Sequence, residues 1–324
     1  MTGYVIQRCL QAVVVMFAMS VIVFVGVYAV GNPMDVLIPL DAPQDVRAFI
    51  IERFGLDRPL WEQYLIFLGN VAQGDFGRSF VYATPVLDLI LSRLPATLEL
   101  TLAAVLGATL IGVPLGIWAG YRPDAISSKS IMAVSILGFS VPTFWVGLIL
   151  ILTFAVYLGW LPAGGRGPTV EVAGVAWSFL TPEGLTHLLL PAVNLALFKL
   201  AMMIRLARAG TREIMLTDTI KFARAAGLSE ATIVRHHVLK LIAVPIVTVF
   251  GLELGSTLAF AVVTETIFSW PGLGKLIIDS ITSLDRPVMV AYLILVAVLF
   301  VTINLVIDLT YAALDPRIAR GHAA

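Results

Sequence analysis

Residues 100–121 read L-T-L-A-A-V-L-G-A-T-L-I-G-V-P-L-G-I-W-A-G-Y, a stretch without a charged side chain that lies between Glu99 and Arg122. A helix that crosses a bilayer needs about 20 mostly apolar residues, so this stretch is long enough to span one. Glycine or proline interrupts it at four positions: Gly107, Gly112, Pro114 and Gly116. In lipid such residues permit close helix packing and kinks. They fit a moving bundle, and they equally fit simple structural packing.

Composition extends the membrane interpretation to the whole chain of 324 residues. Hydrophobic residues make up 59%, charged residues 13%, and the mean hydropathy is +0.95. Soluble proteins average about 45–50% apolar and about 25% charged residues, so a soluble, disordered or collagen-like protein is excluded. The single cysteine, Cys9, excludes a disulfide scaffold and a cysteine-based metal cluster. The net charge of zero offers no basic excess for nucleic acid.

Five further stretches have a comparable length and hydrophobicity. The six predicted spans are Cys9–Val30, Glu99–Arg122, Lys129–Tyr157, His187–Ile204, Leu241–Ile267 and Val288–Ala312. The first span is long and lacks a convincing cleavage site, so it is expected to be a retained helix rather than a signal peptide. We therefore predict an all-α polytopic membrane protein with six transmembrane helices.

The distribution of Lys and Arg predicts the orientation. An even number of spans places both termini on one side, and twelve basic residues lie on that side against three in the two short opposite loops. Basic residues concentrate in cytoplasmic loops, so we expect cytoplasmic N- and C-termini. The basic residues between the first two spans are not counted, because that segment is too long for the rule.

The connections suggest three parts. Residues 1–94 hold the first transmembrane helix and a long extracytoplasmic segment, in which helical spacing of apolar residues predicts short helices around Val46–Phe54 and Trp61–Val71. Residues 95–313 form a core of five helices, and residues 314–324 form a cytoplasmic tail.

A cytoplasmic loop at about residues 207–240 is too polar to span the membrane and too regular to be a plain linker. Thr217 is suited to cap a short helix that ends near Ala226, and Gly227 is a natural C-terminal stop. Ser229 can cap a second helix that leads into the fifth span.

The first of these short helices is amphipathic. Apolar Ile220 and Phe222 alternate with Lys221 and Arg224. A helix of this kind on the cytoplasmic face lies on lipid headgroups or docks in a groove on another protein. Small side chains around Ala225 favour close approach by a protein partner, although the sequence leaves both interpretations open.

Seven short motifs in chain order resemble one family. The stretch A-R-A-A-G at 223–227, followed by His237 and Pro245, resembles the EAA loop of binding-protein-dependent ABC importer permeases, with Ala223 where the family commonly has Glu. The other motifs resemble the B-type subunit of dipeptide and oligopeptide permeases: L-D-R-P-L (56–60), G-D-F-G-R-S (74–79), L-P-A-T-L-E-L (94–100), S-V-P-T-F (140–144), E-T-I-F-S-W-P-G-L-G-K (265–275) and L-D-P-R (314–317).

The resemblance implies a type I ABC importer transmembrane fold in a bacterial or archaeal cytoplasmic (inner) membrane. It also implies a heterodimer with a sister permease, two cytoplasmic ABC ATPase subunits and an extracytoplasmic substrate-binding protein. ATP and Mg would be used by the ATPase subunits, and no cofactor is expected in this chain. The residues implied to contact an ATPase are Thr217, Asp218, Lys221, Phe222, Ala223, Arg224, Ala225, Ala226, Gly227, Leu228, Ser229 and Glu230.

The implied substrates are di- and oligopeptides. The same subfamily pattern covers importers of nickel, glutathione and saccharides, and the binding protein largely sets the choice among them.

Charged residues within or at the edges of the spans are the candidates for the pathway or for structural pairing: Glu99, Lys199, Glu253, Glu265 and Asp308. A charge at mid-bilayer costs about 2.5–3.5 kcal/mol, so such groups face protein or a water-filled path. Glu253 is the best pathway candidate, with a partner group between helices as its alternative, and Ser140 and Pro142 are further candidates. Lys199 is expected to snorkel to the inner interface beside Arg205 and Arg208.

Glu99, Glu265 and Asp308 lie near interfaces, where we expect a solvated or structural role. Asp308 could also pair with one of the basic residues Lys199, Arg205 and Arg208. The turn at 271–274 either re-enters the membrane or lines the outer mouth, or it is purely structural.

Motifs for catalysis or metal binding are not found in the sequence. The stretch G-L-G-K at 272–275 lacks the spacing of a phosphate-binding loop, and there is no H-E-x-x-H or G-x-S-x-G motif. His236 and His237 are adjacent, about 100° apart on a helix, so they cannot chelate one ion from a single face. A secondary transporter or channel is the remote alternative, and it would be expected to show a repeat between halves that is not seen here.

Overall fold

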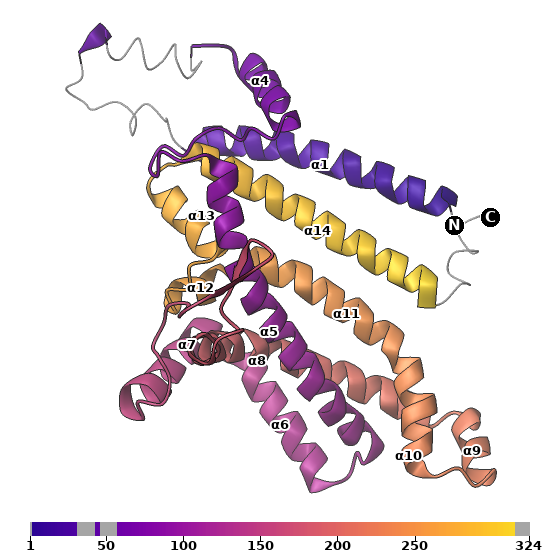
Figure 1. Cartoon of the computed structure of the whole chain (residues 1–324). Helices are drawn as coiled ribbons and strands as arrows, with labels where there is room; N and C mark the ends of the chain where they lie inside the picture. The colour runs from indigo at the N-terminus through magenta and orange to yellow at the C-terminus, as the bar shows by residue number, and fades with distance from the viewer. Residues whose placement is uncertain (1, 31–42, 46–56, 315–324) are drawn as a thin grey trace.

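The computed structural model describes residues 2–30, 43–45 and 57–314. Long helices dominate these residues and lie side by side as a bundle (Figure 1): α1 (Thr2–Val30), α5 (Val86–Tyr121), α8 (Pro182–Met215), α11 (Leu239–Phe260) and α14 (Arg286–Leu314). The expected helix over Val46–Phe54 lies outside the described residues, as does the tail beyond Leu314. The expected helix around Trp61–Val71 is confirmed as α4 (Leu60–Ala72).

Several helices are long and apolar enough to cross a membrane. In the described part of the chain these are Val86–Tyr121, Pro182–Met215, Glu230–Phe260 and Arg286–Ile307, with a fifth if a sharply bent helix pair counts as one span. Within α1, the apolar stretch Val13–Gly26 is shorter than the 18 residues required of a candidate span. A multi-pass membrane protein is thus supported, while the number of six spans stays a prediction.

The expected third span is not one helix. Over Lys129–Tyr157 the structure has α6 (Ile126–Ser140), α7 (Thr143–Leu150) and the π-helix η1 (Ile151–Tyr157). The segments on the two sides of Val141–Pro142 are bent by 103°. Val141 is extended, with φ −92° and ψ 132°, because a residue before proline disfavours the α region. The break therefore falls at the residue before Pro142.

The expected fifth span is longer at its start and broken near its end. It begins with α10 (Glu230–Ile233), continues through the π-helix η2 (Val234–Val238) into α11, and turns at Ala261 into α12 (Val262–Ile267). α5 likewise begins at Val86, so the expected domain boundary at 94/95 falls inside a helix.

Glycines hold α5 against α8. A Cβ added at Gly116 would lie 2.5 Å from the carbonyl oxygen of Ile204, and one added at Gly120 would lie 2.7 Å from that of Arg208. Real Cβ atoms do not approach so closely, so only glycine permits this separation of the two backbones. With Gly112 they form a row at a spacing of four residues, which lies along one helix face. The structure thus gives these glycines a packing role.

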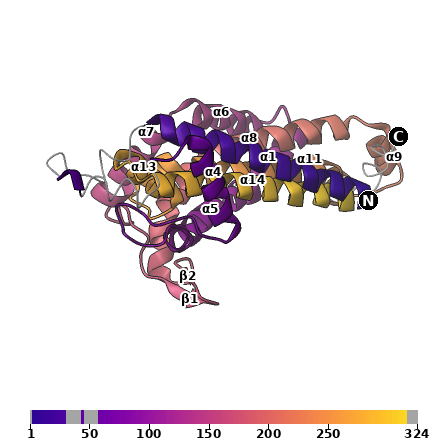
Figure 2. The ribbon, with the colours of Figure 1, turned by 90° about the horizontal axis from the view of Figure 1, so that it is seen from above.

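α13 (Leu273–Thr282) closes the end of the bundle that lies opposite α9 (Asp218–Ala225). Its buried Leu276 packs in one apolar cluster with Val23 of α1, Ile90 of α5 and Tyr292 of α14. A short antiparallel hairpin, β1 (Val170–Val172) and β2 (Val175–Trp177), precedes α8 and projects away from the helices (Figure 2). The all-α expectation did not include this hairpin.

Candidate functional site

The turn between α8 and α11 holds the helix that the sequence singled out. We call residues 217–230 the α9 segment, after α9 (Asp218–Ala225). Thr217 occupies the N-cap position as expected, but its hydroxyl donates to the Ile214 carbonyl at 2.7 Å instead of accepting from the start of α9. Ser229 does cap the next helix, since its hydroxyl accepts from the Thr232 amide at 3.3 Å.

Gly227 ends α9 as expected. Its φ is +81°, in the left-handed region that favours glycine. The Gly227 amide donates to the Arg224 carbonyl at 3.0 Å, and the Leu228 amide donates to the Ala223 carbonyl at 3.1 Å. This pair of hydrogen bonds is the Schellman motif, which satisfies carbonyls at a helix C-terminus. The backbone thus turns sharply between α9 and α10.

The two faces of α9 differ in exposure. Ile220 and Ala223 are buried in a small cluster with Ile233 of α10. On the other face the Phe222 ring is 77% exposed, and Lys221 and Ala225 are also exposed. The helix is therefore fixed to the rest of the chain by one face and presents a large apolar side chain on the other.

An ion pair joins the two sides of the turn. Arg224 donates through Nε and Nη2 to the two carboxylate oxygens of Glu230, at 2.8 and 3.3 Å. The hydrogen bond to Glu230 raises the pKa of Arg224 above its usual value. The hydrogen bond from Arg224 lowers the pKa of Glu230, with a smaller contribution from Tyr121 at the end of α5. Both side chains therefore stay charged at neutral pH.

Lys199 and Glu253 form an ion pair between α8 and α11. Lys199 Nζ lies 2.5 Å from Glu253 Oε2, and the two side chains are 9% and 14% exposed. The expectation that Lys199 snorkels to the interface is wrong, because a carboxylate on the neighbouring helix neutralises it inside the bundle. Glu253 has this lysine as its partner between helices. The Asp308 side chain lies outside the described residues, so its pairing stays a prediction.

Ser140 and Pro142 lie at the break between α6 and α7. Ser140 is exposed, and its hydroxyl donates to the Ile136 carbonyl at 2.9 Å. A mostly apolar cavity of about 500 Å³ lies beside the break, lined by residues of α5, α6, α7 and α8 that include Leu137, Val141 and Leu200. Whether Ser140, Pro142 or Glu253 faces a pathway stays a prediction.

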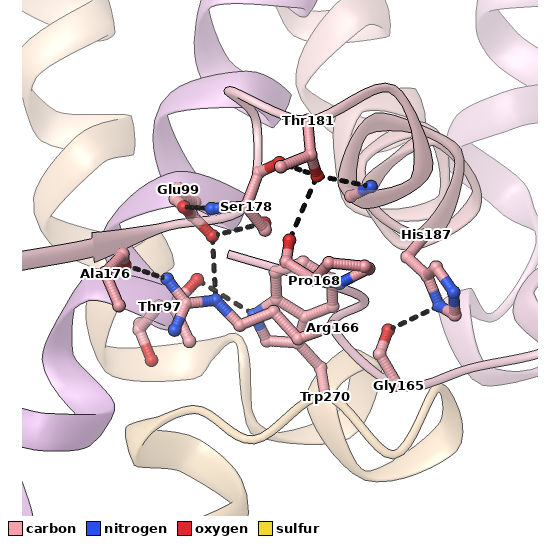
Figure 3. Close-up of polar contacts among 12 residues, drawn as sticks. Thr97, Glu99, Gly165, Arg166, Pro168, Ala176, Ser178, Thr181, His187 and Trp270 are labelled. Carbon is pink, nitrogen blue, oxygen red and sulfur yellow. Dashed lines mark hydrogen bonds and ion pairs between the residues drawn. The ribbon is translucent and has the colours of Figure 1, made fainter. Parts of the chain in front are cut away.

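Glu99 is the centre of a polar network that the sequence did not reveal (Figure 3). Its carboxylate accepts from Arg166 Nε at 3.0 Å, and from the backbone amide and hydroxyl of Ser178 at 2.5 and 2.7 Å. Arg166 also donates to the Ala176 carbonyl at 2.6 Å. Glu99 is therefore buried and structural, and it fastens the segment before α8 to α5.

Further contacts complete this end of the molecule. His187 Nδ1 lies 2.9 Å from the Gly164 carbonyl oxygen and 3.2 Å from the Gly165 carbonyl oxygen, the second of which is drawn in Figure 3. Trp270 Nε1 donates to the Ala96 carbonyl at 2.8 Å. Thr181 caps α8, since its hydroxyl accepts from the Gly184 amide at 2.9 Å. The loop before α8 is thus fixed to α5 through Glu99 and to α8 through His187, and Trp270 fixes the turn before α13 to α5.

Glu265 fixes the start of α13. It is fully buried, accepts from the Thr97 hydroxyl at 2.7 Å, and accepts from the Lys275 amide at 2.9 Å. The Thr97 hydroxyl in turn accepts from the Leu273 amide at 2.7 Å. These acceptors satisfy amides that have no partner within the first turn of a helix. Glu265 therefore has a structural role, while the place of the turn at 271–274 relative to the outer mouth stays a prediction.

Groups of three or more His, Cys, Asp or Glu side chains able to hold a metal ion are absent from the described residues.

Comparison with known proteins bears on this arrangement. A family described as the binding-protein-dependent transport system inner membrane component matches residues 112–320. The chain belongs to this family. The N-terminal family of the same membrane components matches residues 1–101. The chain is therefore a transport component, and a multi-pass protein of the inner membrane.

Curated permeases are similar to this chain over nearly their whole length. The oligopeptide transport system permease protein AppB of Bacillus subtilis (strain 168) is 39% identical over 320 residues, which cover 98% of this chain and 99% of AppB. The di/tripeptide permease DppB of Pseudomonas aeruginosa (strain UCBPP-PA14) is 37% identical over 334 residues, with the same coverages. The glutathione permease GsiC of Escherichia coli (strain K12) is 36% identical over 323 residues, again covering 98% and 99%.

Solved structures of the MetNI methionine ABC transporter share the fold. The native crystal form aligns with a TM-score of 0.54 at 19% identity, covering 68% of this chain and 93% of that chain. A selenomethionine-soaked form gives a TM-score of 0.56 at 20% identity, covering 70% and 96%. The fold of this permease is therefore that of an ABC transporter membrane subunit.

Proposed function

We propose that this chain is one of two permease subunits of an ATP-driven peptide importer, and that it receives force through the α9 segment. The observation that carries the proposal is the exposed Phe222 face of α9. That face is held on a helix whose other face is buried and whose end is fixed at Gly227. A partner that binds there can move α8 and α11 together, since the α9 segment joins them directly.

The partners follow from the family. Two ABC ATPase subunits bind and hydrolyse ATP with Mg, one of them docked on this α9 segment, and this chain itself binds no cofactor and is not an enzyme. A sister permease encloses the pathway with this chain, and a substrate-binding protein delivers the substrate on the opposite side. Six spans with cytoplasmic termini agree with the excess of Lys and Arg around the α9 segment.

Peptides are the proposed substrates because AppB and DppB carry oligopeptides and di- or tripeptides by name. Glutathione is the second candidate, since GsiC is 36% identical to this chain. Uptake of a labelled dipeptide and of labelled glutathione by vesicles that hold the complete transporter separates the two.

Phe222→Ala tests the docking surface. We expect the ATPase subunit to co-purify with the chain at least tenfold less, because the variant removes the large apolar side chain from the exposed face. Phe260→Ala is the matched control, since Phe260 is 78% exposed at the far end of α11, and it should leave co-purification unchanged. Undiminished recovery of the ATPase with Phe222→Ala would contradict the proposed docking face.

A further inference from the structure

α4 is an amphipathic helix whose apolar arc is wider than the surface that covers it. Tyr64, Phe67 and Val71 lie three and four residues apart, hence on one face. The Tyr64 ring meets Phe24 of α1 edge to face at 5.2 Å between centroids, and Phe67 lies 5.7 Å from Phe24. The Tyr64 hydroxyl lies 2.7 Å from the Ser20 hydroxyl. One face of α4 is thus covered by α1.

A second apolar row lies beside this face and is open. Trp61, Leu65 and Leu68 follow the same spacing; Trp61 and Leu65 are 65% and 56% exposed, and Leu68 is half-buried. Glu62 lies on a different arc of the helix, where it pairs at 2.9 Å with Arg58, a residue that precedes α4. An amphipathic helix can lie in the plane of a membrane with its apolar face buried at the level of the acyl chains, and tryptophan is enriched at that interface.

The contacts with α1 place α4 at membrane depth. Ser20 and Phe24 lie ten and six residues before the end of α1 at Val30, which is about 15 and 9 Å along the axis at 1.5 Å per residue. The hydrocarbon core of a bilayer is about 30 Å thick. Figure 1 shows the same arrangement, with α4 meeting α1 away from its end and directed outward from the bundle. A helix of the segment that is expected to be extracytoplasmic thus packs on the apolar stretch of α1, the predicted first span.

The covered face of α1 continues beyond α4 as an open apolar surface. Val13, Phe17, Ser20 and Phe24 lie on one side of α1 at helical spacing. Ser20 and Phe24 are buried, whereas Val13 and Phe17 are both 58% exposed. On the predicted first span of an inner-membrane protein, exposed apolar side chains such as Val13 and Phe17 mark a surface for lipid or for another membrane chain.

We propose that α4 is embedded in the leaflet next to the Val30 end of α1, with Trp61, Leu65 and Leu68 in contact with lipid acyl chains. The long segment between the first two spans is then a membrane-associated element in part. α4 widens the lipid-facing surface of this subunit around α1, and it ties the start of α5 to the bilayer.

Spin labels measure this placement. In a Cys9→Ser background, Leu65→Cys and Glu62→Cys are each labelled with a nitroxide. The chain is then reconstituted, with the subunits that co-purify with it, into phospholipid vesicles. We expect the Leu65 label to collide with oxygen at least fivefold more than with a water-soluble nickel chelate. The Glu62 label, on the polar arc, should have a higher ratio of chelate collisions to oxygen collisions than the Leu65 label.

Two outcomes overturn the proposal. A Leu65 label that collides freely with the chelate lies in water, and one sheltered from both reagents is covered by another protein chain. A Trp61→Cys label repeats the measurement at a second position of the same row. Agreement between the two positions shows that the result is not a local effect of one substitution.

Discussion

At the scale of single residues, Lys199, Glu253 and Glu99 are placed by long-range pairing. Lys199 and Glu253 are 54 positions apart in sequence, and Glu99 and Arg166 are 67 apart. A sequence without structure indicates that such charges need partners, because burying them alone is costly. It does not indicate which partner, since that depends on how α5, α8 and α11 pack. For this reason the sequence alone predicts Lys199 at the membrane interface, whereas the structure pairs it with Glu253.

Removal of Glu253 should destabilise the protein. Glu253→Gln leaves the Lys199 charge buried without a counter-charge, and breaking a buried pair in this way costs about 3–5 kcal/mol. The double variant Lys199→Met with Glu253→Gln should recover most of this loss. The temperature at which the detergent-solubilised protein loses its gel-filtration peak measures both effects.

Glu62→Gln provides the control for this pair. Glu62 and Arg58 are 37% and 48% exposed, and exposed pairs contribute about 0–1 kcal/mol, so the melting temperature should hardly change. An unchanged melting temperature for Glu253→Gln, with altered uptake, would argue instead that the carboxylate acts in the pathway.

At the scale of elements, local signals predicted most of the α9 segment. Glycine at 227 and serine at 229 act on backbone groups within a few residues, so their positions in the sequence were sufficient. The bend at Pro142 is harder to predict from the sequence. Proline is tolerated inside membrane helices, as Pro95 and Pro114 within α5 show, so a proline alone does not tell a kink from a break.

Substitutions at Gly227 should act through backbone strain. A Cβ added there meets nothing within 4 Å, so steric clash is absent, but a left-handed φ costs a side chain about 1–2 kcal/mol. We expect Gly227→Ala to lower uptake in part, and the β-branched Gly227→Val to abolish uptake and substrate-stimulated ATP hydrolysis. Gly227→Asn should stay near the parent, because Asn tolerates this region.

Gly69→Ala is the control for that series, since Gly69 also has open space for a Cβ and lies in helical α4 without a positive φ. Membrane insertion should be normal for all four variants. Full uptake by Gly227→Val would show that the geometry of this turn is not needed for transport.

At the scale of the whole molecule, the long helices α5 and α8 connect the polar network around Glu99 to the α9 segment. α5 has 36 residues and α8 has 34, or about 54 and 51 Å at 1.5 Å per residue. Both exceed the roughly 30 Å of a hydrocarbon core. α8 starts just after the β1–β2 hairpin and ends just before α9, so we expect a single crossing by α8 to place the hairpin and the α9 segment on opposite sides of the membrane.

Labelling with a membrane-impermeant maleimide checks this arrangement and the proposed orientation together. In a Cys9→Ser background, Glu171→Cys marks the hairpin and Asp218→Cys marks α9, where the Asp218 side chain is 95% exposed. In intact spheroplasts we expect Glu171→Cys to react and Asp218→Cys to react only after permeabilisation. The reverse order would keep the two on opposite sides but invert the orientation. Reaction of both before permeabilisation would contradict the single crossing by α8, because no helix that spans the bilayer once can present both of its ends to the same side.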